Sequence, residues 1–384
     1  MKLRLTFPAA ISLTLLAVAL CTGSRLFFLL SVLVLLTVAG SVIAVLWVSA
    51  TLEAEGELSG TAVRRGEDPE LSLRLYHRGL LPVAPLLLEL SDPAGKRERD
   101  IRLKNQPHRL QSVRLPVHAA HVGVFPVGLS ACTVEDLLGI ARKRIPLDRT
   151  SFEMVVLPQT FETEPLELAP GDPGSELMAR ATEDLSAPSD IRSYQPGDAM
   201  KKIHWKLSLR KGELMVRKFD EPILQDVLVL MDCSRPPSWG HAQAEADIRD
   251  ALLETAASVL TAQDGTDHPF RMPLMGSHPV DLEKSMGLSI LLDYLARVDF
   301  SETDRFERVL AIESRRLRKV GCCVVIAARL NIAMVDIMIR MHRAGPNIRL
   351  YLITFAPDDD NVLPLIARLR QAGLEVVYVT PAHS

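Results

Sequence analysis

The sequence has few aromatic residues, few cysteines and almost no net charge. Aromatic residues make up 5% of the 384 residues, and the formal net charge is −3. A chain this close to neutral lacks the overall basic field that draws proteins to nucleic acid, which argues against a nucleic-acid-binding function. The five cysteines are odd in number and lack the spacing of a metal site, so we expect free thiols in a reducing compartment.

Long apolar runs, by contrast, are present at the amino terminus. Residues 5–24 and 26–48 contain no charge, and each approaches or exceeds the roughly 20 apolar residues that a membrane-spanning helix needs. We expect residues 1–52 to form a transmembrane hairpin. Lys2 and Arg4 favour a cytoplasmic amino terminus, so the rest of the chain would also be cytoplasmic. The first run also fits a signal peptide, and this alternative remains open.

Residues 53–157 change to a two-residue alternation that is typical of strands. LSLRLYHRG and HRLQSVRLPV alternate between apolar and polar residues, and turn sequences such as RRGEDPE and SDPAGK separate the runs. This spacing predicts a β-rich module that resembles an immunoglobulin-type sandwich. Residues 158–222 begin as an acidic linker rich in proline, glycine and serine, and they continue into an unusual basic segment.

That segment, RSYQPGDAMKKIHWKLSLRKGELMVRKFDE, predicts a turn, a short helix and a strand. Pro196 and Gly197 fit the central positions of a type II turn, and Asp198 follows as a potential helix cap. Ile203 would lie on the apolar face of the helix, and Gly212 would end it. The strand ELMVRKF would follow.

Basic side chains surround this predicted helix. They form either a solvated helix face or an interaction patch for an acidic protein surface, anionic lipid or the preceding acidic linker, through charge-assisted pairs. The patch comprises Lys201, Lys202, Lys206, Arg210 and Lys211. We expect His204 and Trp205 to be packing residues, because no nucleophile or second ligand accompanies the histidine in the sequence.

Apolar strands and amphipathic helices alternate over residues 223–384. Strands are expected at 226–232, 321–330, 348–356 and 374–381, and helices at 242–263, 286–298, 332–345 and 362–373. This pattern predicts a doubly wound α/β domain with a parallel sheet covered on both faces. Ligands of such domains bind beyond the carboxyl ends of the strands, where Asp232 and Ser234 follow the first strand.

The basic segment and the strand after it resemble the signature of the DUF58 family, whose pattern matches this chain at Arg192, Tyr194, Pro196, Gly197, Asp198, Ile203, His204, Trp205, Gly212, Leu214 and Glu221. The resemblance implies a protein of the bacterial inner membrane with two membrane helices, a β module and a von Willebrand factor A-like domain. Because genes of this family commonly lie beside those of MoxR-type AAA+ ATPases, it also implies such an ATPase as a partner.

The same resemblance raises the question of a metal site. In metal-binding von Willebrand A domains the first strand is followed by Asp-x-Ser-x-Ser, whose oxygens hold Mg²⁺. Here Pro236 replaces the second serine, and Arg329 follows a later strand where an aspartate is expected. We therefore expect no cofactor, with Mg²⁺ at a degenerate metal-ion-dependent adhesion site of Asp232 and Ser234 as the alternative. Asp264 or Asp267 would be further ligands of that site.

Two functions from different classes follow. The favoured one is a membrane-anchored protein-interaction or scaffold module that partners a MoxR-type ATPase in the assembly or maturation of other complexes, and that is not an enzyme. The alternative is a metal-dependent hydrolase using Asp198, His204 and Asp232. That chemistry requires the three side chains to converge in one pocket.

Overall fold

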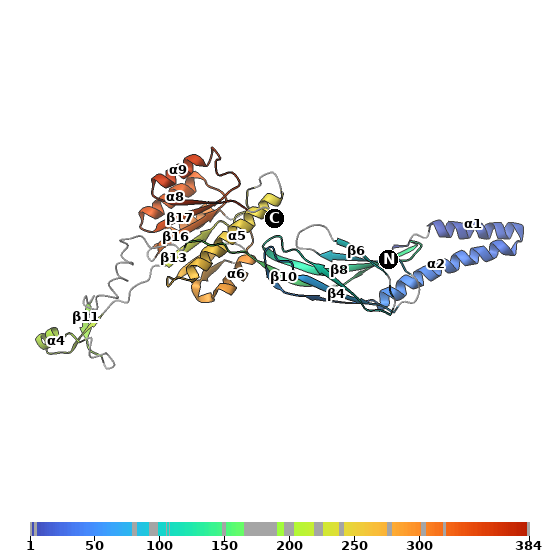
Figure 1. The fold of residues 1–384 in the computed structure, drawn as a ribbon, viewed down its shortest axis with the longest axis horizontal. Coiled ribbons are helices and arrows are strands. Elements are labelled where there is room, and N and C mark those ends of the chain that lie inside the picture. Colours follow the sequence, from blue (N-terminus) through green and yellow to red (C-terminus); the bar gives the residue numbers. More distant parts are fainter. Residues whose placement is uncertain are drawn as a thin grey trace. The chain divides into compact units, whose positions relative to one another are not determined.

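The computed structural model describes residues 2–3, 6–78, 83–91, 99–104, 106, 108–147, 151–164, 190–195, 203–218, 226–237, 242–274, 279–300, 305–317 and 320–381 (Figure 1). The chain divides into two compact units between Pro158 and Gln159. Each unit has its own hydrophobic core, as expected of separate domains.

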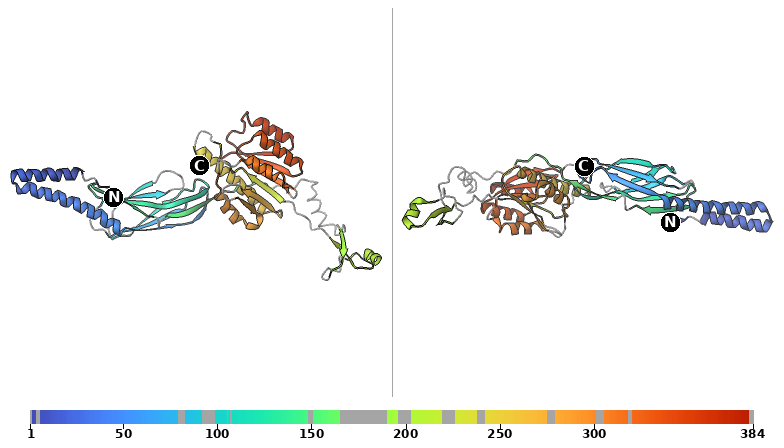
Figure 2. Two further views of the ribbon diagram at one scale, coloured as in Figure 1. Left: turned by 180° about the vertical axis from the view of Figure 1, so that it is seen from behind. Right: turned by 90° about the horizontal axis from the view of Figure 1, so that it is seen from below.

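Two apolar helices begin the first unit, α1 (Thr6–Thr22) and α2 (Arg25–Thr51). Of the described helices, α2 is long and apolar enough to cross a membrane, and α1 is a shorter apolar helix. The helices lie side by side (Figure 2), and the Ser31 hydroxyl donates to the Ser12 carbonyl oxygen at 3.0 Å. Gly23 turns the chain between them with a positive φ of 64°.

The carboxyl-terminal part of α2 packs against the β module. Ala44, Val45 and Val48 are buried in the module's hydrophobic core. The Lys143 Nζ donates to the Ser49 hydroxyl at 2.9 Å, which ties the end of α2 to strand β9 (Ala141–Pro146). The helix therefore continues directly into the β module, without a linker between them.

Two sheets make up the β module. A three-stranded sheet has the order β2 (Glu53–Leu58), β4 (Glu70–Tyr76), β7 (Gln111–Pro116). The seven-stranded sheet has the path β1-β9-β8-β10-β3; in addition, β5 pairs with β8 and β6 pairs with β5. Its remaining strands are β1 (Lys2–Leu3), β3 (Ala62–Arg64), β5 (Leu86–Ser91), β6 (Arg99–Leu103), β8 (Gly123–Glu135) and β10 (Ser151–Leu157).

The two sheets share one hydrophobic core, because the apolar residues that alternate along their strands are buried together. Leu71, Leu73 and Leu75 of β4 are buried with Leu88 of β5 and Leu129 of β8. Period-two alternation is thus what places apolar side chains on one face. The immunoglobulin-type assignment stays a prediction.

A small hairpin carries the basic segment in the second unit. Strands β11 (Asp190–Ser193) and β12 (Met215–Lys218) pair antiparallel as their own two-stranded sheet. Helix α4 (Trp205–Lys211) lies between them in sequence. The observed helix is shorter than the sequence predicted. Ile203, which was expected on its apolar face, instead forms an isolated β-bridge to Val216.

The main sheet of the second unit has six strands in the order β15-β14-β13-β16-β17-β18. Neighbours from β14 to β18 run parallel, and β15 is antiparallel to β14. The strands are β13 (Asp226–Met231), β14 (Phe270–Leu274), β15 (Val280–Glu283), β16 (Val320–Ala327), β17 (Asn347–Ile353) and β18 (Glu375–Val379).

Helices cover both faces of this sheet (Figure 1). The first group is α5 (Ala242–Asp264) and α6 (Leu288–Ala296), which follows a 3₁₀ turn at Lys284–Met286. The second group is α7 (Phe306–Glu313), α8 (Ile332–Arg343) and α9 (Leu363–Gln371). The prediction of a multidomain α/β protein is confirmed at this level, and the von Willebrand A-like assignment stays a prediction.

Candidate functional site

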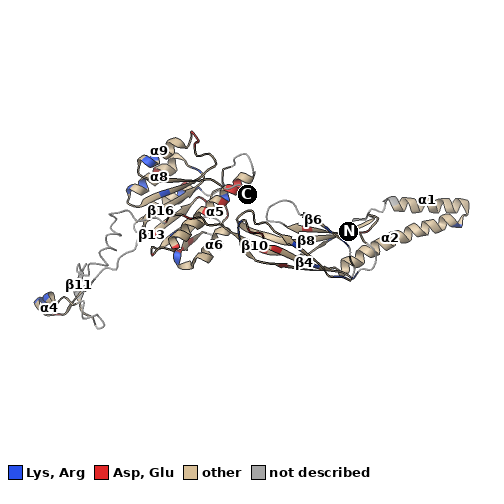
Figure 3. Cartoon of the chain, viewed as in Figure 1, with Lys and Arg blue, Asp and Glu red and all other residues tan. Residues whose placement is uncertain are grey.

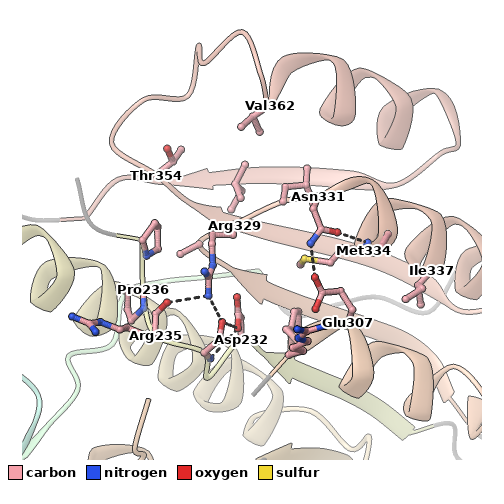
Figure 4. Close-up of a pocket in the computed structure, with 18 of the residues that line it drawn as sticks. Asp232, Arg235, Pro236, Glu307, Arg329, Asn331, Met334, Ile337, Thr354 and Val362 are labelled. Carbon is pink, nitrogen blue, oxygen red and sulfur yellow. Dashed lines mark hydrogen bonds between the residues drawn. The ribbon is translucent and has the colours of Figure 1, made fainter. Parts of the chain in front are cut away.

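The carboxyl ends of three neighbouring parallel strands meet at one edge of the sheet. Asp232 follows β13, Arg329 follows β16 by two residues, and Thr354 follows β17. With the amino ends of α7 and α8 they line an open groove of about 1350 Å³ (Figure 4). This is the edge at which ligands of open α/β sheets bind.

A chain of hydrogen bonds joins the first two strand ends. The Ser234 amide and hydroxyl both donate to Asp232 Oδ1, the amide at 3.0 Å. Arg329 Nη2 donates to the Ser234 hydroxyl at 2.5 Å and to the Arg235 carbonyl oxygen at 2.9 Å (Figure 4). The guanidinium therefore holds the β13 and β16 loops together, and it acts on Asp232 through the serine.

Burial decides the electrostatics of Asp232, whose exposed fraction is 4%. Loss of solvation raises the pKa of this carboxyl, and the two hydrogen bonds from Ser234 and the charge of Arg329 oppose the shift. Glu307, across the groove, raises the pKa further. The net shift is upward, so burial outweighs the partners in this structure.

Helix α8 supplies the opposite wall of the groove. Asn331 caps α8, because its Oδ1 accepts the Met334 amide at 2.9 Å. Its Nδ2 donates to Glu307 Oε1 of α7 at 2.5 Å (Figure 4). The cap thus fixes the amino ends of α7 and α8 relative to each other.

The side-chain oxygens of Asp232 and Ser234 are a poor match to Mg²⁺, which prefers six oxygen ligands in near-octahedral geometry. Asp232 and Ser234 bond to each other, and the serine also accepts from Arg329. Among the described residues no group of three or more His, Cys, Asp or Glu side chains could hold a metal ion. Asp264 and Asp267 precede β14, whose start pairs with the start of β13, so they lie at the opposite edge from Asp232.

In the basic segment that contains β11, α4 and β12, one buried serine bonds to both the helix and a strand, and the sequence did not single it out. Ser208 is 6% exposed, donates to the His204 carbonyl oxygen at 3.0 Å and accepts the Met215 amide at 2.8 Å. The bond from the Met215 amide fastens α4 to β12. His204 caps α4, because its Nδ1 accepts the Leu207 amide at 3.2 Å, and Gly212 ends it with a φ of 74°.

The expectation that Trp205 is a packing residue is wrong. Trp205 is 57% exposed and Leu209, one helical turn later, is 84% exposed. Lys206, Arg210 and Lys211 are exposed on the same short helix, which Figure 3 shows as basic. The helix contacts its neighbouring strand through the buried Ser208, and Trp205 and Leu209 lie in solvent.

Several predicted residues lie outside the described part of the chain: Pro196, Gly197, Asp198, Lys201, Lys202 and Glu221. Of Arg192 only the backbone is described, in β11, and Tyr194 follows that strand. The Tyr194 amide donates to the Leu214 carbonyl oxygen at 2.8 Å. The described signature residues Tyr194, His204, Trp205 and Gly212 thus belong to one hairpin-and-helix unit, whereas Asp232 and Ser234 belong to the strand-end groove.

Comparison with known families supports the resemblance seen in the sequence. Residues 190–277 match the family described as "Protein of unknown function DUF58". The match spans both the basic hairpin and the first strand of the sheet with its Asp232–Ser234 loop. This finding confirms the DUF58 resemblance over that segment.

Individual relatives add little beyond the family. The chain is 28% identical over 83 residues to the "Uncharacterized protein YeaD" of Bacillus subtilis (strain 168), a match that spans 21% of each protein. Among solved structures, Cwp6 from Clostridium difficile and a β-glucuronidase from Bifidobacterium dentium align with 86% of this chain and 52% of their own. Their identities are 9% and 8% and their TM-scores 0.19, so they support no assignment.

Proposed function

We propose that the protein is a membrane-anchored interaction module that binds a MoxR-type AAA+ ATPase during the assembly or maturation of other complexes. The helices α1 and α2 would form a two-pass anchor in the bacterial inner membrane. The β module and the von Willebrand A-like domain would then be held on the cytoplasmic side. The choice of partner follows from the gene association that the resemblance to DUF58 implies, and residues 190–277 match that family.

The observation that carries this proposal is the exposed face of α4. It combines Trp205 and Leu209 with Lys206, Arg210 and Lys211 on two turns of helix. Tryptophan and arginine are enriched among the residues that dominate binding energy at protein interfaces. Exposed apolar and basic side chains on one helix favour a partner surface that offers both apolar and acidic groups.

Charge reversal on α4 tests the proposal. We expect K206E/R210E to weaken binding of the full-length protein in nanodiscs to the purified MoxR-type ATPase of the same organism by roughly tenfold or more at low salt. The difference should shrink at high salt, because the Debye length falls from about 10 Å at 0.1 M to about 3 Å at 1 M. Surface plasmon resonance with and without ATP and Mg²⁺ measures both effects.

A matched control is R340E/R343E, which reverses two exposed charges on α8. It should leave binding unchanged, and W205A should weaken binding with little dependence on salt. Binding that is insensitive to K206E/R210E and to W205A contradicts the proposal. So does turnover of a hydrolysable substrate by the purified protein that is lost in H204Q and D232N.

A further inference from the structure

Strand β18 forms one edge of the six-stranded sheet. It pairs with β17, and no strand within the described part of the chain pairs with its other side. The Thr354 amide donates to the Val379 carbonyl oxygen at 3.1 Å, so the backbone groups of Val379 face β17. Because backbone groups alternate between the two sides of a strand, those of Val376 and Tyr378 face away from β17. This edge therefore offers donors and acceptors to a further strand.

The residues of β18 give little protection against pairing with another chain. Edge strands are commonly protected by charged side chains, proline or bulges. Strand β15 at the opposite edge follows this rule, because Asp281 and Glu283 are two of its four residues. In β18 (EVVYV) the one charged residue is Glu375, which pairs with Arg349 at 2.6 Å. The composition of β18 thus favours the addition of a further strand.

A cavity of about 560 Å³ lies beside β18 and is lined by α5, β17, β18 and residues 161–164. Its volume is within the roughly 300–1,000 Å³ of typical ligand sites. Hydrogen bonds fix residues 161–164 as one wall. The Phe161 amide donates to the Ser258 hydroxyl at 2.9 Å, and Arg349 Nη1 donates to the Glu164 carbonyl oxygen at 3.1 Å. Such a wall is formed in advance, which lowers the entropic cost of binding.

The lining of this cavity combines apolar and acidic groups. Phe161 is 42% exposed, and Val377 and Val379 of β18 are half-buried. Four carboxylates and one guanidinium line the cavity, so its formal net charge is −3. These charged residues are Glu162, Glu164, Glu254, Glu375 and Arg349. Because the guanidinium is already paired with Glu375, the cavity favours a cationic group that is flanked by apolar ones.

We propose that β18 and this cavity form a peptide-binding site. An extended segment of a partner protein adds to the sheet beside β18, with backbone hydrogen bonds to Val376 and Tyr378, and inserts a lysine or arginine side chain into the cavity. Alternate side chains of a strand lie on one face, so the residues two positions before and after the basic residue are apolar and contact Phe161 and Val377. This site does not include α4 and is independent of the proposed function.

Fluorescent seven-residue peptides test the site on the full-length protein in nanodiscs of zwitterionic lipid. The peptides carry valine two positions before and after a central Lys, Arg, Gln or Glu. We expect the Lys and Arg peptides to bind roughly tenfold more tightly than the Gln peptide, and the Glu peptide to bind most weakly. Fluorescence anisotropy measures the affinities, with empty nanodiscs as the blank.

Two protein variants test the role of the acidic lining. E162Q/E164Q removes two exposed carboxylates of the cavity and should reduce the preference for basic peptides. D358N/D360N is the matched control, because it removes two exposed carboxylates that do not line the cavity, and it should retain the preference.

N-methylation of the peptide tests the added strand without changing the protein. Methylation of an amide that faces β18 should abolish binding, whereas methylation of the neighbouring amide should be tolerated. Hydrogen–deuterium exchange should show protection of the Val376 and Tyr378 amides in the complex.

Three results would overturn the proposal: equal binding of the Lys and Gln peptides, an unchanged preference in E162Q/E164Q, or equal effects of methylation at neighbouring amides. Dimerisation of the protein through β18 that excludes the peptides would also overturn it, because a second copy of the chain would then occupy the edge.

Discussion

Single residues of this chain join separate elements of the fold. Ser234 and Arg329 are 95 residues apart and join the loops after β13 and β16. Ser208 joins α4 to β12 over seven residues. In both cases a small hydroxyl acts as donor and acceptor at once, which lets one buried group satisfy two neighbours.

Gly212 offers a test at this scale. Its φ of 74° lies in the left-handed region, and a Cβ placed there would meet no heavy atom within 4 Å. G212A should therefore cost about 1–2 kcal/mol through backbone strain alone. Hydrogen–deuterium exchange of the amides of α4 and β12 measures the loss.

Asparagine tolerates the left-handed conformation better than alanine. G212N should consequently be less destabilising than G212A. Equal protection of α4 in the wild type and in G212A would contradict the assignment of Gly212 as the helix end.

At the level of secondary-structure elements, charged contacts connect strands within the β module. Glu89 of β5 accepts from Arg144 Nε of β9 at 2.6 Å and from the Thr133 hydroxyl of β8 at 3.1 Å. The three strands are consecutive in the sheet, so one side chain spans two strand pairs. The contact favours the observed register of the three strands, because a shift of one strand by one residue would move its side chain to the other face of the sheet.

This contact predicts a pH dependence. The hydrogen bond from Arg144 is the largest cause that lowers the pKa of Glu89 below its ordinary value of 4.5. A lowered pKa means that the folded state binds the proton more weakly than the unfolded state, so the contribution is present above pH 4.5 and is lost as the pH falls through the folded value. E89Q should be less stable by about 1 kcal/mol at pH 7 and should converge with the wild type in acid.

Thermal unfolding followed by circular dichroism at a series of pH values measures this difference. E55Q is a suitable control, because Glu55 is an exposed residue of strand β2. A gap between E89Q and the wild type that stays constant down to pH 2 would rule out the ionised contact as its source.

At the level of the whole molecule, the apolar helices are the basis of the proposed membrane anchor. The described structure has one helix, α2, of sufficient length and apolarity for a membrane, and its carboxyl-terminal part is buried in the β module. The large apolar side chains earlier in α2, such as Leu29 and Leu36, are exposed. This division fits the proposed membrane anchor, which would lead directly into the folded β module.

Cys21 provides a probe of the proposed two-pass topology. It is the exposed cysteine near the turn between α1 and α2, whereas Cys132, Cys233, Cys322 and Cys323 are buried. Burial raises the pKa of Cys132 to about 12 and also raises that of Cys323, so these thiols are poor nucleophiles. A membrane-impermeant maleimide added to intact cells stripped of the outer membrane should therefore label Cys21.

C21S should remove this labelling, and denaturation of the wild type should expose all five cysteines. Labelling of Cys21 only after the inner membrane is opened would show that the turn faces the cytoplasm. That result would reverse the proposed orientation.

The sequence predicted the elements whose pattern is local and strong. The apolar runs predicted α1 and α2, and the alternation of buried strands with amphipathic helices predicted β13, α5, α6, β16, α8, β17, α9 and β18. Four strands and α-helices of the second unit were missed: β11, β14, β15 and α7. The helix α7 had a detectable signal, because Phe306, Val309, Leu310 and Glu313 are buried at helical spacing. The strands were missed because each is short, and Pro273 interrupts the pattern of β14.

The sequence by itself therefore determined the order of the modules and the sheet edge at which Asp232 and Arg329 lie, because periodicity and the direction of parallel strands are local properties of the chain. Only the tertiary structure decided that Arg329 reaches the Ser234 hydroxyl, that Ser208 fastens α4 to β12, and that Trp205 faces solvent. These outcomes depend on contacts between segments, and the periodicity of either segment alone does not determine the free energy of such contacts.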